Sequence, residues 1–445
     1  MTAFTYLDAP AAESQLAQLA AQFYALHHPA GHFPAVEYLP LCPKQSRLDR
    51  GLRAVFMDMD GTTTTTEFIS NHAMGIALTN VSCPGQDAQA VALSEEDVAH
   101  MIGHNLTTNL RYIHRHYAAR VDPALAFEHY LDAALWLQHH AINPAHRSSL
   151  PDDLDALGLG TIASELLALA PGSLPQHLPR FRAQTAGALN VADPEVWNRV
   201  GAALYYRQYH ALLRRIDAGE GQQLARELFG TPQISAVLPL PGVGYWQALV
   251  KGVLTPESAQ QCVEWFVKDS APVVAHTAPL ARLAKLFQAR PAKIALVTSS
   301  LRAEADIVLR EIFRVLRSEI ELAPWPDAIQ SALLACYRDP AEHYDAIITA
   351  NDAHEHRLKP HRDLYAIALS RVGMAHEDLD RVLGLEDTEA GVVALRAAGI
   401  GMACALPYEG TITQNFAAAA AVCYRGLPEV LLEKHCFIPE ANWPA

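Results

Sequence analysis

Five short runs of apolar residues along the chain have the pattern of buried β-strands. They lie at residues 53–60, 293–300, 344–352, 381–387 and 400–406. The apolar residues in these runs are continuous rather than alternating, which is typical of strands buried on both faces of a parallel sheet. Stretches with helical periodicity separate the later runs, at residues 302–317, 361–373 and 388–399. This alternation predicts a doubly wound α/β domain, whose ligands bind beyond the carboxyl ends of the strands.

The spacing of the strands predicts a second domain. The interval between the first and second strand, residues 61–292, is mostly helical in its pattern of apolar positions. We therefore expect a large α-helical domain inserted into the α/β domain. The predicted boundaries are 1–50 for an N-terminal extension, 51–70 plus 274–440 for the α/β core, and 71–273 for the helical insertion. The extension contains one helical stretch, residues 13–28, and has no assigned role.

Composition narrows the classes of function. The chain has 445 residues, of which half are apolar and 18% are charged, so it is a globular protein with room for two or three domains. Its 34 basic and 48 acidic residues give a net charge of −14, which argues against a nucleic-acid or anionic-membrane partner. The seven cysteines form no CxxC pair and favour free thiols in a reducing compartment. Without a signal-peptide pattern or a membrane-length apolar run, we expect a cytoplasmic protein.

Two carboxylates lie at the end of the first predicted strand. Asp58 and Asp60 are two residues apart, so both side chains point to the same side, and Gly61 allows a close backbone approach. Carboxylates this close repel each other unless a cation or a shared proton relieves the repulsion. The alternative interpretation is an exposed Asp-Gly turn after a strand.

A second acidic pair, Glu386 and Asp387, lies at the end of another predicted strand. The alternative for this pair is a helix N-cap made by Asp387 or Thr388. Two acidic strand ends in one sheet would place three or four oxygen atoms around one point. Such a site suits a hard cation, and Mg²⁺ fits it better than a metal that prefers thiolate or imidazole ligands.

Two further stretches carry candidate phosphate ligands. Thr298, Ser299 and Ser300 end a predicted strand just before a helix, where hydroxyl and backbone N–H groups suit a phosphate. An ordinary N-cap explains them equally well. Lys359 precedes a proline near the start of a helix, and taken alone it is a surface lysine.

These four stretches resemble, in the same order, the four motifs of the haloacid dehalogenase (HAD) superfamily, in its phosphatase and phosphomutase branch. VFMDMDGT resembles the family's hhhhDxDGT motif, and IALVTSS resembles its strand that ends in Ser or Thr. KPHRDLY resembles the lysine motif, and LEDTEAGVVALRAAG resembles the acidic pair followed by a glycine-containing helix. The resemblance covers about residues 50–70 and 276–430.

The resemblance implies a role for each motif in phosphoryl transfer. Asp58 would attack phosphorus and form an aspartyl-phosphate, which divides one difficult displacement into two easier ones. Asp60 would protonate the leaving oxygen and then deprotonate the attacking water. Thr298 and Lys359 would bind the phosphoryl oxygens and stabilise the charge of the transition state.

The resemblance also implies a Mg²⁺ cofactor. The metal would be held by Asp58, by the carbonyl of Asp60 and by Asp387, with help from Glu386. Dehalogenase members of the family lack the second aspartate and the metal, so Asp60 argues against a dehalogenase.

The run of five threonines begins in the first motif and continues into the position of the family's hinge. Thr62 corresponds to the threonine of the first motif and is a candidate for contacts to the substrate, as are Ser299 and Ser300. Residues 63–66 are expected to form the hinge, with Thr65 replacing the usual hinge aspartate.

An insertion between the first and second motifs is in the position of the family's helical cap, which closes over the pocket and selects the substrate. The stretch IGHNLTTNLRYI resembles the cap loop that contacts the leaving group. Gly103, His104, Asn105 and Arg111 are therefore candidate substrate-binding residues, with a structural helix-turn-helix as the alternative. The insertion is much longer than the family's usual small cap, so the substrate pocket cannot be copied from the family.

The sequence thus predicts a Mg²⁺-dependent phosphohydrolase that cleaves a small phosphorylated metabolite, a phosphomonoester, through an aspartyl-phosphate. One alternative is a phosphomutase of the β-phosphoglucomutase type, which uses the same intermediate. Another is a non-catalytic binding or regulatory protein with a retained HAD-like core. The sequence makes no prediction of the substrate's identity or of the oligomeric state.

Overall fold

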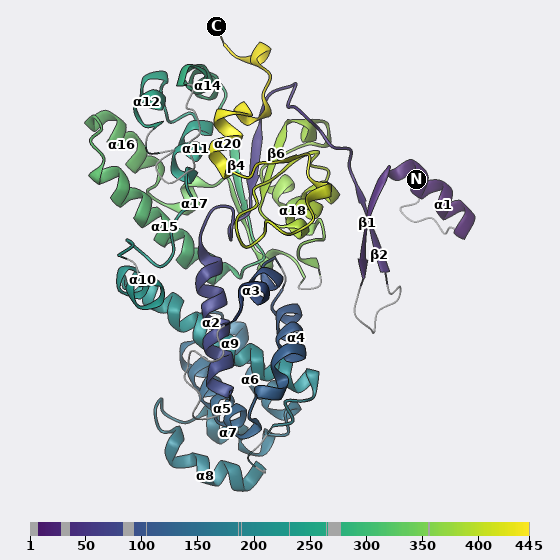
Figure 1. Cartoon of the computed structure of the whole chain (residues 1–445), viewed down its shortest axis with the longest axis vertical. Helices are drawn as coiled ribbons and strands as arrows, with labels where there is room; N and C mark the ends of the chain where they lie inside the picture. The colour runs from purple at the N-terminus through teal and green to yellow at the C-terminus, as the bar shows by residue number, and fades with distance from the viewer. Residues whose placement is uncertain are drawn as a thin grey trace. The chain divides into compact units, whose positions relative to one another are not determined.

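The chain folds into two compact units in the computed structural model (Figure 1). The core unit comprises Met1–Thr63, Pro239–Ser300 and Leu316–Ala445, and the helical unit comprises Thr64–Leu238 and Leu301–Val315. The structure describes residues 8–27, 36–82, 93–103, 105–185, 187, 189–230, 232–263, 265, 277–354 and 357–444.

A six-stranded parallel sheet forms the centre of the core unit. Its strands are β3 (Ala54–Met57), β4 (Lys293–Val297), β5 (Ala346–Ile348), β6 (Val382–Glu386), β7 (Met402–Ala405) and β8 (Ala421–Val422). Their spatial order is β5-β4-β3-β6-β7-β8. Counted from β3, this is the 3-2-1-4-5-6 order of a doubly wound sheet, in which ligands bind where the strand order reverses. The reversal lies at β3, between its neighbours β4 and β6.

Helices cover both faces of this sheet, which confirms the predicted fold class of an α/β core with a large helical insertion. On one face, Phe56 and Val297 lie in a buried cluster with Tyr365 of α18 (Asp363–Arg371) and Leu395 of α19 (Glu389–Ala397). Figure 1 shows α11 (Val243–Val250) and α20 (Gly426–Leu432) on the side opposite to α18. Burial on both faces explains why the strands read as continuous apolar runs. The other core helices are α1 (Ala9–Leu19), α12 (Pro256–Gln261), α14 (Thr277–Ala289), α16 (Asp327–Cys336) and α17 (Pro340–His343).

The helical unit is built around the long helix α9 (Pro194–Asp217). Trp197 of α9 is buried, and its indole N–H donates a hydrogen bond of 2.9 Å to the carbonyl of Leu110. The remaining helices of the unit are α2 (Thr66–Val81), α3 (Glu95–Met101), α4 (Leu106–Tyr117), α5 (Pro123–His140), α6 (Pro144–Ala156), α7 (Gly160–Leu167), α8 (Leu174–Thr185) and α10 (Gly221–Phe229). The first part of α15 (Arg302–Leu322) belongs to this unit as well, since Glu304 pairs with the buried His210 of α9 at 2.9 Å.

The observed boundaries of the helical unit differ from the predicted insertion, 71–273. The first boundary falls inside the threonine run, between Thr63 and Thr64, and the second falls between Leu238 and Pro239. The helix α11 belongs to the core unit because all of its residues are buried there, against α14 and α20. The sequence of α11 is apolar throughout, so it does not predict which of the two units the helix belongs to.

The N-terminal extension contains strands where the sequence predicted a helix over residues 13–28. The helix α1 ends at Leu19, and β1 (Gln22–His27) pairs antiparallel with β2 (Val36–Leu41). Leu39 and Leu41 of β2 are buried against Val393 of α19, so tertiary packing overrides the helical periodicity. The extension belongs to the core unit.

Two results bear on the expectations drawn from composition. Among the helices that the structure describes, none is long and apolar enough to cross a membrane. The described cysteines, all except Cys83, are free thiols.

We predict that Gly384→Ala destabilises the core unit. A Cβ atom at Gly384 would lie 2.5 Å from both methyl carbons of Leu395, where β6 packs against α19. Overpacking of this kind costs roughly 1–3 kcal/mol of unfolding free energy. Urea unfolding of the variant and the wild type would measure the difference. The matched control is Gly75→Ala in α2, where a Cβ meets nothing within 4 Å and the helix should gain about 0.5–1 kcal/mol. Equal effects of the two changes would contradict the packing argument.

Candidate active site

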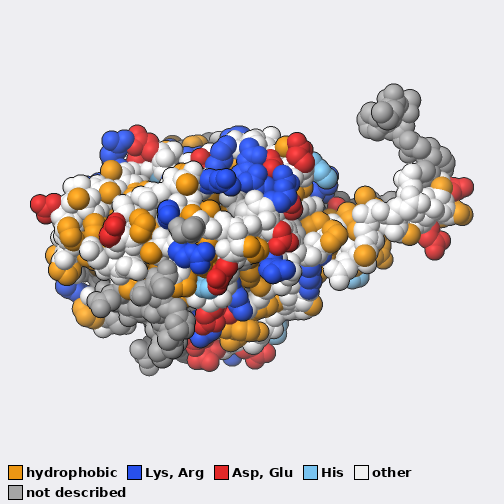
Figure 2. Space-filling view, turned by 90° about the horizontal axis from the view of Figure 1, so that it is seen from above, with side chains coloured by type: hydrophobic (Ala, Val, Ile, Leu, Met, Phe, Trp, Pro, Cys, Tyr) orange, Lys and Arg blue, Asp and Glu red, His pale blue; other side chains and the backbone are white. Residues whose placement is uncertain are grey.

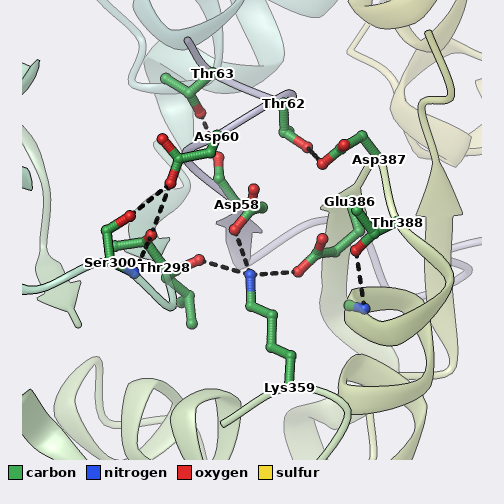
Figure 3. Close-up of polar contacts among 12 residues, drawn as sticks. Asp58, Asp60, Thr62, Thr63, Thr298, Ser300, Lys359, Glu386, Asp387 and Thr388 are labelled. Atoms are coloured by element: carbon green, nitrogen blue, oxygen red, sulfur yellow. Dashed lines mark hydrogen bonds and ion pairs between the residues drawn. The ribbon is translucent and has the colours of Figure 1, made fainter. Parts of the chain in front are cut away.

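Two neighbouring strands bring the predicted carboxylates together. Met57 at the end of β3 is in register with Leu385 of β6, so Asp58 and Glu386 follow at the same level of the sheet. Asp58, Glu386 and Asp387 each offer a carboxylate oxygen, and these atoms lie within 4.8 Å of one another. All three residues are buried, and Figure 3 shows their side chains around the end of the Lys359 side chain. The acidic strand ends therefore meet where the strand order reverses.

Lys359 lies between the two acidic strand ends. Its ammonium contacts the Asp58 carboxylate and lies 2.7 Å from Glu386, and it donates a hydrogen bond of 3.0 Å to the carbonyl of Val297. The ammonium also lies 5.3 Å from the centre of the Tyr365 ring, at the distance of a cation–π contact. Only 8% of the Lys359 side chain is exposed, so the interpretation as a surface lysine is wrong.

Asp60 has different neighbours from Asp58, although the two residues share one strand end. The hydroxyl groups of Thr298 and Ser300 donate hydrogen bonds of 3.1 and 2.9 Å to the same oxygen, Oδ2, of Asp60. The backbone N–H of Ser300 in turn donates to the Thr298 hydroxyl at 2.9 Å. The motif after β4 thus orients Asp60. Ser299 is exposed and has no side-chain hydrogen bond to any described residue, so its substrate contact stays a prediction.

Three threonines support the acidic groups from the side. The Thr62 hydroxyl donates to Asp387 at 3.1 Å, and the Thr63 hydroxyl donates to the backbone carbonyl of Asp58 at 2.6 Å. Thr388 is the N-cap of α19, and its side chain accepts a hydrogen bond of 3.1 Å from a backbone N–H of the first turn. Since Thr388 makes the cap, the interpretation of Asp387 as the N-cap is wrong.

Two glycines make room for the carboxylates. A Cβ atom at Gly61 would lie 2.4 Å from an oxygen of Asp387, and a Cβ at Gly391 would lie 2.0 Å from the carboxyl group of Glu386. Gly61 also has a φ of 84°, a conformation that other residues rarely adopt. Gly61 of the first motif is therefore required by Asp387 of the fourth motif, and Gly391 of the fourth motif is required by Glu386 of the same motif.

The site carries an excess of negative charge. Burial raises the pKa of Asp58 well above its ordinary value, Lys359 opposes this shift, and the charges of Glu386 and Asp60 add to it. Burial alone would lower the pKa of Lys359, but Asp58 and Glu386 raise it above its ordinary value, so this lysine is a cation. One ammonium is thus surrounded by several carboxylates, including Asp387, and another cation would relieve their repulsion.

The donor atoms fit a hard divalent cation. Oε2 of Glu386 is buried and has no hydrogen-bond partner among the described residues, while Oε1 contacts Lys359 and accepts from the Tyr365 hydroxyl. The three clustered residues offer only carboxylate oxygens, the ligands that Mg²⁺ prefers. The carboxylate of Asp60 is not part of this cluster, which leaves its backbone carbonyl as the predicted ligand.

The candidate residues of the insertion lie in the helical unit. Gly103 has a φ of 83°, and Asn105 is the N-cap of α4, accepting a hydrogen bond of 2.9 Å from the backbone N–H of Thr108. Arg111 lies on α4, and His104 lies outside the described residues. The cap made by Asn105 agrees with the structural alternative, and substrate contacts by these four residues stay a prediction.

The sequence analysis missed Tyr365 as a site residue. Its hydroxyl donates to Glu386 and its ring contacts Lys359. Burial and the nearby carboxylates raise the pKa of Tyr365 well above its ordinary value, so the hydroxyl stays a donor. The only available signal was its place in KPHRDLY, where it follows Lys359 by six residues.

Comparison with known proteins gave structural likenesses only. No family model and no curated protein matches the sequence. CbbY from Rhodobacter sphaeroides in complex with phosphate is similar with 14% identity and a TM-score of 0.39, over 84% of this chain and 93% of that chain. A hydrolase from Pseudomonas syringae has 13% identity and a TM-score of 0.37, over 87% and 100% of the two chains. A HAD family hydrolase from Deinococcus radiodurans R1 with bound phosphate and sodium has 14% identity and a TM-score of 0.36, over 88% and 99%. With TM-scores below 0.5, the fold assignment rests on the strand order above, and the function is inferred from the site residues.

We predict that Mg²⁺ stabilises the wild-type protein and that Asp387→Asn abolishes this effect. A cation that binds only the folded state at about one hundred times its Kd adds about 2.7 kcal/mol to the unfolding free energy. Melting temperatures measured in a series of Mg²⁺ concentrations test this expectation. The control is Glu377→Gln, a change at an exposed carboxylate outside the cluster, which should respond like the wild type. If the melting temperature of the wild type does not change with Mg²⁺ concentration, the result would argue against the metal site.

Without a divalent cation, the charge on Asp58 should make stability depend on pH. The pKa of Asp58 is raised in the folded state. Its contribution to the unfolding free energy is therefore complete below pH 3.8, the ordinary pKa of the group, and declines as the pH rises through the folded-state pKa. We expect the unfolding free energy of the wild type, relative to Asp58→Asn, to fall in chelator as the pH rises above about 4, the ordinary pKa of the carboxyl group. Urea unfolding at each pH measures this difference. Parallel curves for the two proteins would refute the assignment.

Proposed function

We propose that this protein is a Mg²⁺-dependent phosphohydrolase of the HAD type, acting on a small phosphorylated metabolite through an aspartyl-phosphate. The observation that carries the proposal is the different environment of two aspartates on one strand end. Asp58 is buried against the Lys359 ammonium, whereas Asp60 is held by the hydroxyls of Thr298 and Ser300. Carboxylates in unlike environments can take unlike roles, one as nucleophile and one as general acid and base.

Asp58 is the proposed nucleophile. The backbone of this residue is fixed at both ends, because its N–H donates to the carbonyl of Leu385 at 3.0 Å and its carbonyl accepts from Thr63. An oxygen of the Asp58 carboxylate forms a bond to phosphorus while the bond from phosphorus to the alcohol oxygen breaks. The positive charge of Lys359 offsets the repulsion between this carboxylate and the incoming phosphate dianion.

Asp60 is the proposed general acid and base. Two hydroxyl donors on one oxygen hold the carboxyl group in a single orientation, ready to deliver a proton to the leaving alcohol. After the alcohol departs, the same carboxylate takes a proton from water as the water oxygen attacks phosphorus. The bond from phosphorus to Asp58 then breaks, which releases inorganic phosphate and restores both aspartates.

The proposed cofactor is Mg²⁺, held by Asp58, Glu386 and Asp387 with the backbone carbonyl of Asp60. When bound, such a cation supplies positive charge to the phosphoryl oxygens and offsets the mutual repulsion of the carboxylates. Tyr365 keeps Glu386 oriented through its hydroxyl hydrogen bond, so the carboxylate presents its remaining oxygen without reorganisation. The helical unit is the proposed substrate-selecting cap, with Gly103, His104, Asn105 and Arg111 as its candidate contacts.

The proposal is tested with two esters that differ in their leaving group, 4-nitrophenyl phosphate and glycerol 2-phosphate. Asp58→Asn should abolish phosphate release from both esters, because the nucleophile is lost. Asp60→Asn should slow the alkyl ester about 10²–10⁴-fold and the aryl ester less, since nitrophenolate leaves without a proton. The measurement is release of inorganic phosphate in Mg²⁺, with Asp352→Asn, outside the site, as the folded control.

The rival functions give different results in the same assay. Phosphate release that survives Asp58→Asn or chelation contradicts the aspartyl-phosphate mechanism. Transfer of the phosphoryl group to a second sugar phosphate without release to water indicates a phosphomutase. A folded protein that binds Mg²⁺ but turns over no phosphate ester indicates a binding or regulatory role.

A further inference from the structure

A second polar site lies at the opposite edge of the sheet, in the core unit. A cavity of about 280 Å³ is lined by Arg50, Arg290 and Arg381 and by apolar side chains that include Leu52 and Phe287. Each arginine belongs to a segment that leads into one of three adjacent strands, β3, β4 or β6. Since parallel strands all begin at the same edge, the sheet gathers the three guanidinium groups.

This cavity is separate from the acidic site. Arg381 immediately precedes β6, and Glu386 is the last residue of that strand. Five residue steps along an extended strand span about 16 Å. Asp58 follows β3 and Leu52 precedes it, so β3 separates the two sites in the same way. A ligand in the cavity would not touch the groups assigned to phosphoryl transfer.

The nearby carboxylates leave part of this positive charge unbalanced. Arg50 lies 2.9 Å from Asp380 and 3.7 Å from Asp378, and Arg381 lies 3.4 Å from the same Asp378, which also pairs with Arg53. Arg50, Arg381 and Arg53, which does not line the cavity, therefore share two carboxylates.

Two of the arginines that line the cavity have N–H donors without an acceptor among the described residues. Nε of Arg381 is buried and has no hydrogen-bond partner among the described residues. The side chain of Arg290 is exposed and has no ion-pair partner in the part of the chain that the structure describes. The carboxylate that lines the cavity, Asp49, lies 3.9 Å from Arg47 and so has a cation of its own.

Positive side chains are also concentrated on one face of the molecule. Figure 2 views the face that carries α14 and the C-terminal segment of the core unit, and Lys and Arg side chains gather there next to a smaller number of carboxylates. Such a patch is notable in a chain whose net charge is −14. Local positive potential in an acidic protein attracts anions to one place on its surface.

We propose that this cavity binds a small organic anion, with a phosphate or carboxylate group at the arginines and an apolar body against Leu52, Phe287 and Ile438. Guanidinium groups bind both kinds of anion through paired N–H donors. The apolar lining and a volume far above that of one water molecule suit the carbon skeleton of such a ligand.

Binding of two probes to the protein tests this site, with phenylphosphonate and phenylacetate as the two anion types. Calorimetry is done in chelator, where the acidic site repels a dianion. We expect one or both probes to bind more tightly than inorganic phosphate, which lacks the apolar body. Arg290→Gln should weaken binding about tenfold or more, because a charged donor pair is lost. This arginine is exposed and unpaired among the described residues, so the variant should fold.

A control variant separates the cavity from other sources of binding. Arg226→Gln removes an exposed arginine of the helical unit and should bind the probes like the wild type. The proposal is overturned if no probe binds the wild type, or if Arg290→Gln and Arg381→Gln bind normally. Because the readout is binding without Mg²⁺, this result is independent of whether the protein hydrolyses phosphate esters.

Discussion

The crowding of carboxylates at the ends of β3 and β6 is the constraint on which the rest of the core unit depends. Asp58, Glu386 and Asp387 offer oxygen atoms within 4.8 Å of one another in a buried position. Like charges at this distance are unfavourable, so the surrounding residues must supply compensation. Lys359 provides the ammonium, and Tyr365 provides a hydroxyl donor beneath it. The proposed chemistry on a phosphate dianion would use this arrangement, because such chemistry requires cations held at a fixed point.

The meeting of the acidic strand ends could be predicted from the sequence because it follows from backbone geometry alone. Parallel strands in a doubly wound sheet end at one edge, so acids placed after two neighbouring strands converge there. The environment of each acid could not be predicted in the same way. Asp58 and Asp60 follow the same strand, yet one contacts Lys359 and the other accepts from Thr298. Those partners come from segments more than two hundred residues away along the chain. Which partner lies beside which aspartate is therefore decided only by the folded structure.

The helix predicted over residues 13–28 and the predicted bounds of the insertion differ from the structure for one reason, which is tertiary packing that local patterns do not reveal. The segment β1 has the periodicity of a helix, but Leu39 and Leu41 of its partner strand are buried against α19. The helix α11 is apolar throughout, so its sequence fits either unit, and its burial in the core unit decides the boundary. Tertiary packing also explains why some positions must be glycine. Gly391 is needed because the Glu386 carboxyl group fills the space of its side chain.

The two edges of the sheet carry opposite charge for the same geometric reason. Residues that follow the strands, such as Asp58 and Glu386, gather acidic groups at the carboxyl edge. Residues that precede the strands, such as Arg381, gather guanidinium groups at the amino edge. A parallel sheet therefore creates two sites at once, since every loop at one edge is a neighbour of the others. The cation proposed at the carboxyl edge and the anion proposed at the amino edge rest on the same electrostatic argument, because each would offset an excess of charge.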